Sequence, residues 1–162
     1  MSRDVAILVL GLGNSLLSDD GVGVHVIAAL HVVLGKRPGI SLCDGGTLGL
    51  SLLPDVEAAK SLILVDAGEL KSAAGDIRCF EGEAMDRRLV GKKRTAHEVA
   101  AADLLDAAAL TTGRPANRVL IAVQPASTDW GLEPTPSVRA AVPEVCRTVL
   151  SYIERWSPDA LA

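Results

Sequence analysis

The sequence has very few aromatic residues, and this scarcity limits how its core can be built. Phe, Trp and Tyr make up 2% of the 162 residues, whereas hydrophobic residues as a group make up 49%. The core must therefore consist mainly of Leu, Val, Ile and Ala, a composition typical of sheets covered by helices on both faces. A chain of this length is expected to form one domain over residues 1–162.

Cysteine is also scarce, and its spacing excludes two kinds of stabilised domain. Cys43, Cys79 and Cys146 are far apart and odd in number, so they form neither a disulfide framework nor a C-x-x-C metal site. The apolar run near the N-terminus is too short for a signal peptide or a membrane span. We therefore expect a protein of the reducing cytoplasm that has no membrane partner.

An excess of positive charge is absent as well. The formal net charge of −4 at pH 7 gives no general attraction to nucleic acids or anionic membranes. The local exception is DRRLVGKKR at residues 86–94, which contains five cations. Such a segment can contact an acidic partner surface, but we interpret it as a solvated loop.

Aliphatic runs alternate with helical patterns along the chain, which predicts an α/β fold. The fourth run follows the third too closely for a parallel crossover, so we expect it to be antiparallel and near an edge. The prediction is a three-layer α/β/α domain with a mostly parallel five-stranded sheet, one antiparallel strand and helices on both faces. Strands are expected at residues 5–10, 39–44, 61–65, 75–83 and 118–123, and helices at 22–34, 50–60, 96–110 and 142–156.

Acidic residues follow three of the predicted parallel strands. Asp19 and Asp20 come after the first strand, Asp44 ends the second, and Asp66 follows the third. Ligands of open α/β sheets bind beyond the carboxyl ends of the strands, and His97, at the start of a helix, can reach the same edge. Two carboxylates and an imidazole suit a divalent ion such as nickel or zinc and leave coordination positions open.

The glycines before these acids do not form a nucleotide-binding loop. The dinucleotide fingerprint needs a third glycine at the helix start, but Gly11 and Gly13 are followed by Leu16. Acids at a helix N-terminus would also occupy the place where a pyrophosphate binds. A single Asp at a strand end is commonly a cap or turn residue. We therefore expect Asp19 to cap the following helix and Asp20 to be a metal ligand.

Five short motifs follow one another along the chain: GLGNSLLSDDGVG at residues 11–23, DGGT at 44–47, LILVDA at 62–67, TAHE around His97, and VQP at 123–125 followed by DWG. In this order they resemble the motifs of the maturation endopeptidases of nickel-iron hydrogenases, and the resemblance covers residues 5–156. It implies a cytoplasmic α/β protein that removes a short C-terminal extension from the precursor of the hydrogenase large subunit after nickel has been inserted.

The resemblance also implies a set of site residues. The metal-binding positions of the family fall on Asp20, Asp66 and His97, and the metal is nickel shared with the precursor, or another divalent ion such as zinc. Many family members have Glu at the position of Asp20, so we expect weaker metal binding here without substrate. The resemblance also makes Asp44 a contributor to the site or its architecture. From the residues themselves we expect Asp44, Gly45, Gly46, Thr47 and Gln124 to contact the substrate.

Several alternatives remain open at this point. Gly45 and Gly46 are explained equally well by a turn. For Gln124 an ordinary strand-end amide is favoured over contact with the substrate. Trp130 is either a structural anchor or a partner contact. The bound ion either identifies a nickel-loaded precursor or activates a water molecule. A non-enzymatic carrier or sensor of nickel or another divalent metal, or a hydrolase of small amides, would use the same residues. We expect a monomer.

Overall fold

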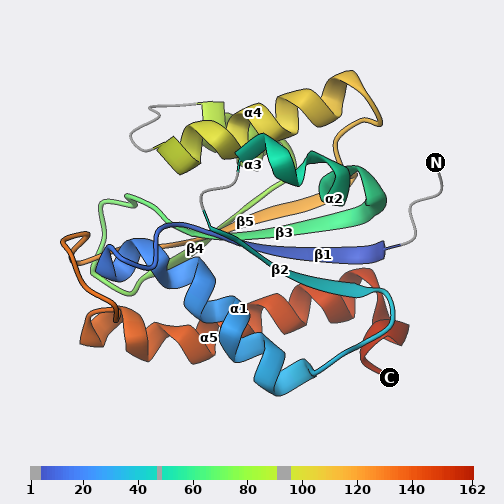
Figure 1. Cartoon of the computed structure of the whole chain (residues 1–162). Helices are drawn as coiled ribbons and strands as arrows, with labels where there is room; N and C mark the ends of the chain where they lie inside the picture. The colour runs from blue at the N-terminus through green and yellow to red at the C-terminus, as the bar shows by residue number, and fades with distance from the viewer. Residues whose placement is uncertain (1–4, 47–48, 91–95) are drawn as a thin grey trace.

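Five strands form one sheet at the centre of the molecule (Figure 1). The computed structural model describes residues 5–46, 49–90 and 96–162, and the side chains of residues 96–100 lie outside this description. The strands lie side by side in the order β2-β1-β3-β5-β4. Their bounds are Val5–Leu12 for β1, Ile40–Gly46 for β2, Ala59–Ala67 for β3, Ile77–Glu81 for β4 and Asn117–Val123 for β5.

The directions of the strands follow from the lengths of their connections. β1 is parallel to β2 and β3, and β3 is parallel to β5. β4 is antiparallel to β5 and lies at an edge, because the segment between β3 and β4 is shorter than the roughly dozen residues that a parallel crossover needs. The predicted mostly parallel sheet with one antiparallel strand is confirmed.

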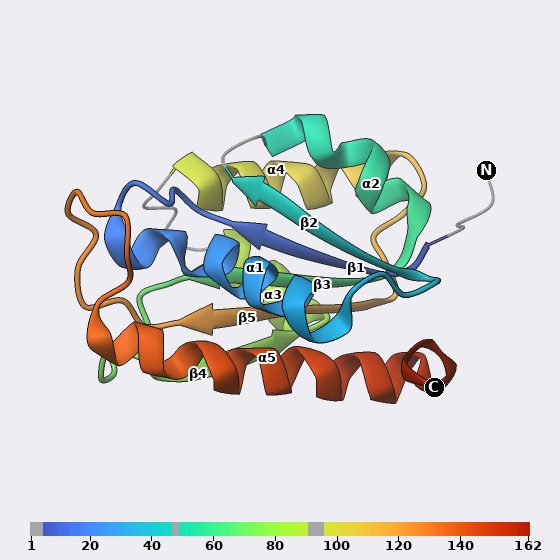
Figure 2. The same ribbon diagram turned by 60° about the horizontal axis from the view of Figure 1, so that its bottom comes forward.

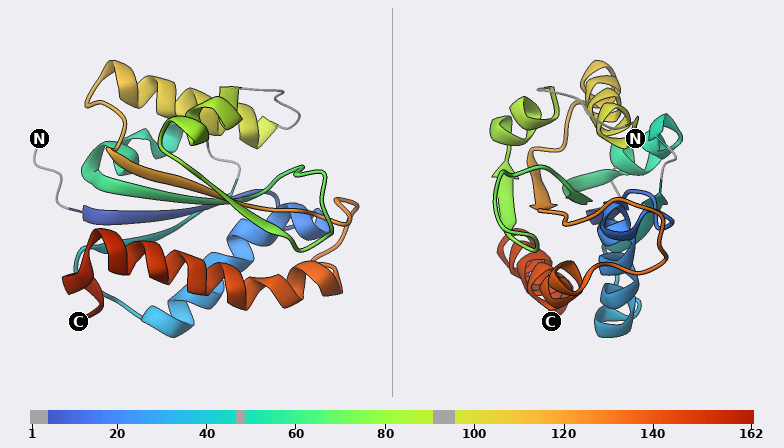
Figure 3. Two further views of the ribbon diagram at one scale, coloured as in Figure 1. Left: turned by 180° about the vertical axis from the view of Figure 1, so that it is seen from behind. Right: turned by 90° about the vertical axis from the view of Figure 1, so that its left-hand side faces the viewer.

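Helices cover both faces of the sheet and make three layers (Figures 1 and 3). Each face has its own apolar core, built from alternate residues of the same strands. Ile7 and Val9 of β1 pack against α1 and α5, whereas Leu8 and Leu10 pack against the helices of the other face. The helices are α1 (Val22–Leu34) and α5 (Pro136–Trp156) on one face, and α2 (Leu53–Ala58), α3 (Glu83–Val90) and α4 (Ala96–Leu110) on the other.

Most element boundaries agree with the sequence-based expectations. The helices predicted at 22–34 and 96–110 are confirmed as α1 and α4, and each strand begins and ends within two residues of its expected position. The helix predicted at 50–60 begins late, because Pro54 occupies its first turn and a short 3₁₀ helix, η2 (Gly49–Leu52), precedes it. The pattern alone was therefore sufficient for the main architecture.

The start of the last helix was predicted wrongly. It was expected at residue 142, but α5 begins at Pro136, with Thr135 as its N-cap residue. Proline at the first position of a helix is common, because its missing N–H would have no intrahelical partner there. The helix continues through Pro143, at the expense of one internal hydrogen bond.

The prediction of a solvated loop at residues 86–94 is also wrong for its first part. Residues 86–90 belong to α3, and residues 91–94 lie outside the described part of the chain. Met85 and Leu89 lie one helical turn apart and are both buried against the sheet. This apolar pair anchors the helix, while Arg87 remains exposed.

One end of the molecule gathers the features that matter for a site (Figure 2). The carboxyl ends of the parallel strands lie there, on the left in Figures 1 and 2, together with the starts of α1 and α4 and the loop between β5 and α5. Open α/β sheets bind their ligands at this edge. The fold therefore directs the search for a functional site to these loops.

Candidate active site

The loop that follows β1 carries Asp20 to the carboxyl end of the sheet. Gly11 of β1 is level with Asp44 on β2 and with the residue before Asp66 on β3. The chain then forms a 3₁₀ helix, η1 (Ser18–Gly21), which leads directly into α1. The acids that follow the first three parallel strands therefore lie at one edge of the sheet, as expected.

Asp20 and Asp66 are both buried, and they lie around the same glycine. Their exposed fractions are 6% and 5%. A Cβ atom on Gly13 would lie 1.9 Å from the backbone oxygen of Asp20 and 3.6 Å from Oδ1 of Asp66. The φ of Gly13 is +124°, so only glycine fits this close approach. Oδ2 of Asp20 accepts a hydrogen bond from the N–H of Asn14 at 3.0 Å.

Asp19 does not cap α1, and this prediction is corrected. The N-cap residue of α1 is Gly21, and no side chain caps that helix end. The carboxylate of Asp19, which is fully buried, instead accepts hydrogen bonds from the loop between β5 and α5. The donors are the N–H groups of Ala126 (2.8 Å), Ser127 (3.1 Å) and Thr135 (2.6 Å), and the hydroxyl of Thr135 (2.8 Å).

These hydrogen bonds keep Asp19 ionised inside the protein. Burial by itself would raise the pKa of the carboxyl. The hydrogen bonds from Thr135, Ala126 and Ser127 together outweigh burial, so the pKa of Asp19 lies below its ordinary value. The charge also lies at the beginning of α5, where the helix dipole favours an anion. Asp19 therefore joins the β1 loop to the start of α5.

The DGG segment has a clear structural role. Oδ1 of Asp44 accepts the N–H of Gly46 at 3.0 Å, and Gly46 has a φ of +47°. A Cβ on Gly45 would lie within 3 Å of the side chains of Leu10, Leu12 and Leu52. The turn and the packing together explain why these positions are glycines, and contact of Asp44, Gly45 and Gly46 with the substrate stays a prediction.

Gln124 is buried and binds the protein's own loops. Its Oε1 accepts the N–H of Leu70 at 2.7 Å, and its Nε2 donates to Oε2 of Glu69 and to the oxygen of Pro125, both at 3.1 Å. Its backbone N–H and oxygen bind the segment before β4. The structure therefore shows Gln124 as the residue that holds the β3–β4 loop, and its proposed contact with the substrate stays a prediction.

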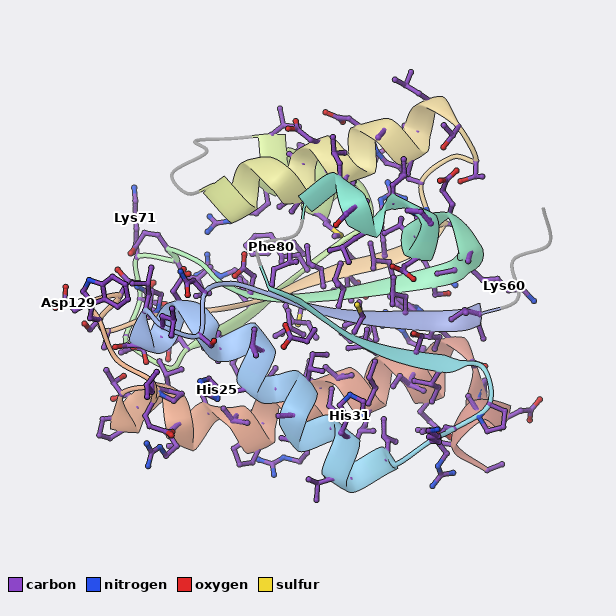
Figure 4. The ribbon with its side chains drawn as sticks, in the orientation of Figure 1. His25, His31, Lys60, Lys71, Phe80 and Asp129 are labelled. Carbon is purple, nitrogen blue, oxygen red and sulfur yellow. The ribbon has the colours of Figure 1, made fainter. Side chains whose placement is uncertain are left out.

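Two predicted site residues fall partly or wholly outside the described atoms. Thr47 and the side chain of His97 are not among them. The backbone of His97 lies in the first turn of α4, whose start is at the same end of the sheet as the β1 loop (Figure 1). Figure 4 shows His25 and His31 on α1, across the sheet from α4. The role of His97 as a third ligand stays a prediction.

The surroundings of the three cysteines disfavour their thiolate forms. Burial raises the pKa of Cys43, Cys79 and Cys146. The charges of Asp55 and Asp44 raise that of Cys43 further. A raised pKa keeps a thiol protonated near neutral pH, and only the thiolate attacks readily. The site therefore offers carboxylates rather than a thiolate for chemistry.

The donor set at the sheet edge fits a divalent cation. Asp20 and Asp66 are two buried acids at the same edge of the sheet, and carboxylates that approach each other in a partly desolvated site repel unless a positive charge or a proton intervenes. Among the described side chains no group of three His, Cys, Asp or Glu residues is arranged to hold a metal, and Asp20 and Asp66 supply two such donors. With an imidazole as a third ligand, such a set suits nickel or zinc and leaves positions open for a substrate.

The role of Asp19 was missed by sequence reasoning. Its partner Thr135 is 116 residues away, and no local pattern reveals such a pairing. The only signal in the sequence was the Thr-Pro pair at residues 135–136, which is typical of a helix start. Recognising it would have placed the start of α5 correctly and shown that the preceding loop ends at Thr135.

Comparison with known proteins identifies similar sequences over most of the chain. The family model described as hydrogenase maturation protease matches residues 24–152. The hydrogenase 2 maturation protease of Escherichia coli is 32% identical over 96% of this chain and 94% of its own length. The hydrogenase expression/formation protein HoxM of Cupriavidus necator is 34% identical over 93% of this chain and 75% of its own length.

Solved structures agree with these sequence matches. The hydrogenase maturating endopeptidase HybD from E. coli superimposes with a TM-score of 0.86, at 32% identity, over 94% of each chain. The [NiFe] hydrogenase maturation protease HybD from Thermococcus kodakarensis gives a TM-score of 0.77 at 26% identity, covering 91% of this chain and 98% of its own. The three-layer fold is thus shared with solved structures of hydrogenase maturation proteases.

Proposed function

The chain belongs to the family of hydrogenase maturation proteases, and we propose that it removes a C-terminal extension from the nickel-loaded precursor of a nickel-iron hydrogenase large subunit. Membership of the family makes the protein a peptidase. The comparisons support this function and not that of a metal carrier or sensor. The observation that carries the proposal is that Asp20 and Asp66 are both buried at the carboxyl end of the sheet, with the backbone of Asp20 and Oδ1 of Asp66 both near the place that a Cβ on Gly13 would take.

In this proposal the nickel ion arrives with the substrate. Asp20, Asp66 and His97 provide two carboxylates and an imidazole, and this set leaves coordination positions for ligands that the precursor already holds. Zinc or another divalent ion would suit the same donors. A nickel held by cysteine thiolates of the precursor would dock on these residues, so cleavage would wait for metal insertion.

Hydrolysis itself can follow two routes. In both, the oxygen of a water molecule adds to the carbonyl carbon, the C–N bond breaks and the amine leaves with a proton. In the first route the ion only positions the loaded precursor, and a carboxylate assists the water. In the second route an ion held by Asp20, Asp66 and His97 would lower the pKa of the water. The raised thiol pKa values favour either route over attack by a cysteine.

The direct test is incubation of the protein with a large-subunit precursor, loaded with nickel or free of it, followed by mass spectrometry. We expect a loss of mass from the C-terminus of the loaded precursor only. Asp66→Asn, which keeps the size of the buried side chain, should lower the cleavage rate on the order of 100-fold or more. Equal cleavage of the nickel-free precursor would contradict recognition of nickel.

The remaining expectations concern the setting of the reaction. No helix in the described part of the chain is long and apolar enough to cross a membrane. A cytoplasmic location, a monomeric state and the absence of a nucleic-acid partner stay predictions. Fractionation of cells that express the protein, and light scattering of the purified protein at its calculated mass of 16.8 kDa, would test the first two.

A further inference from the structure

We propose that Asp19 is a positioning residue for this protease: it fastens the loop between β5 and α5 to the β1 loop and thereby fixes the carboxylate of Asp20. The inference rests on the proposed function, since it takes Asp20 as a residue that binds the nickel of the precursor. The observed partners of the Asp19 carboxylate all belong to the loop of residues 126–135, so we assign Asp19 a role that acts through Asp20 rather than by direct contact with substrate or metal.

The strength of this connection is visible in its hydrogen bonds. Oδ2 of Asp19 accepts three of them, from Ala126, Ser127 and the hydroxyl of Thr135, and Oδ1 accepts the N–H of Thr135. The N–H of Asp19 also donates to the backbone oxygen of Ser127 at 3.1 Å. Both oxygens and the backbone of one buried residue thus hold the two ends of a loop that is far away in sequence.

The segment before Asp19 is bound to the middle of the same loop. The N–H of Ser18 donates to the oxygen of Gly131 at 2.9 Å, and its hydroxyl donates to the oxygen of Asp129 at 2.8 Å. The N–H of Gly131 donates to the oxygen of Leu16 at 2.9 Å. These bonds hold Ser18 at a φ of +50°, a conformation that persists in a residue with a side chain only where its surroundings impose it.

Asp20 is the next residue after this anchored pair. It shares one turn of η1 with Ser18 and Asp19, so a rotation of that turn would move its carboxylate directly. Oδ2 of Asp20 meets the N–H of Asn14 at 3.0 Å, and its backbone lies against Gly13. Protection of the Asn14 N–H from hydrogen exchange therefore depends on the position of the Asp20 carboxylate. It can be measured on the protein alone, with no metal or substrate present.

The test compares two Asp→Asn substitutions at opposite ends of the sheet. Asp19→Asn keeps the shape of the side chain but places an NH₂ group opposite N–H donors. Asp86→Asn is the matched control, because Asp86 accepts two hydrogen bonds from Arg118 (2.9 and 2.6 Å) at the amino end of β5. Both changes weaken a buried or half-buried carboxylate contact, but only the first one lies beside Asp20.

Two measurements are made on each full-length variant at a temperature where it is folded. The first is cleavage of the nickel-loaded precursor, and the second is hydrogen exchange of the Asn14 amide by NMR. We expect Asp19→Asn to lower kcat about 10- to 100-fold, as for other residues that orient a metal-binding side chain, and to speed exchange at Asn14. Asp86→Asn should change neither measurement.

A second pair of variants covers the case in which Asp19→Asn does not fold. Thr135→Val removes one donor to Asp19, whereas Thr135→Ser keeps the hydroxyl. We expect slower cleavage and faster exchange at Asn14 for the first and wild-type behaviour for the second. The inference is overturned if Asp19→Asn and Thr135→Val lower only the melting temperature. If the wild-type protein cleaves no precursor, the proposed function fails, while exchange at Asn14 still tests the positioning by Asp19.

Discussion

At the scale of single residues, the length of the side chain at position 20 decides how far its carboxylate extends from the β1 loop. Asp20 is short, and one of its oxygens already accepts the N–H of Asn14. A glutamate would place its carboxylate one methylene further from the backbone of the β1 loop. The residue type at this position is therefore expected to set the affinity of the protein for a metal ion when no precursor is present.

We expect Asp20→Glu to bind Ni²⁺ more tightly than the wild-type protein by about tenfold, or about 1.4 kcal/mol. The physical reason is that the longer side chain can bring its carboxylate closer to an ion that Asp66 also binds. Calorimetric titration of the purified proteins with NiCl₂ measures the difference, and Asp66→Asn serves as the variant with a lost ligand. Tight binding by the wild type that Asp20→Glu does not improve would contradict the idea.

The three cysteines provide a second test at this scale. Burial raises the pKa of each thiol, which lowers the fraction of thiolate, the form that attacks readily. We expect Cys43→Ser, the variant closest to Asp44 and the sheet edge, to cleave the precursor at the wild-type rate. Iodoacetamide should likewise leave the activity of the folded protein intact. Loss of cleavage in Cys43→Ser would instead indicate that the Cys43 thiol takes part in the reaction.

At the scale of elements, α3 is joined to the sheet by one strong ion pair. Asp86 on α3 accepts two hydrogen bonds from the guanidinium of Arg118 on β5, and both side chains are mostly buried, with exposed fractions of 17% and 13%. This arrangement raises the pKa of Arg118, mainly through its hydrogen bond to Asp86. Such two-pronged contacts are stronger than single hydrogen bonds.

We expect Asp86→Asn to lower the free energy of unfolding by about 1 to 3 kcal/mol, since it removes a charged hydrogen bond from a partly buried arginine. Urea denaturation followed by circular dichroism measures the change. The neighbouring exposed pair of Arg87 and Glu83, 3.9 Å apart, offers the control, because Glu83→Gln should cost less than about 0.5 kcal/mol. Equal effects of the two substitutions would show that burial does not matter here.

The elements also show what a sequence pattern can predict and what it cannot. The strands were predictable because continuous aliphatic runs between glycines and acids indicate buried parallel strands. α3 was not predicted because its sequence is rich in charged residues. Its two buried residues, Met85 and Leu89, are one turn apart and form too short an apolar pattern to indicate a helix. The function of Asp19 was not predictable, since it depends on Thr135 across 116 residues. Periodicity describes single elements, whereas contacts between loops depend on the completed fold.

At the scale of the whole molecule, most large apolar side chains are buried in the two cores, and a few are exposed beside the site. Leu16, Trp130 and Leu132 are exposed by 46%, 81% and 70%. Leu16 and the segment around Trp130 are neighbours, because the N–H of Gly131 donates to the oxygen of Leu16. Trp130 is therefore not a structural anchor, which was one of its two possible roles, and contact with a partner remains the other.

We expect Trp130→Ala to raise KM for the nickel-loaded precursor without changing kcat. A tryptophan that is buried at the centre of an interface commonly contributes more than about 2 kcal/mol to binding, which corresponds to roughly a 30-fold change in affinity. Its removal should leave the free energy of unfolding within about 0.5 kcal/mol of wild type, because the side chain packs against little of its own protein. Val32→Ala, at an exposed position on α1 (87%), provides the control. Steady-state kinetics together with urea denaturation decide the matter, and an unchanged KM would exclude Trp130 from the surface that binds the precursor.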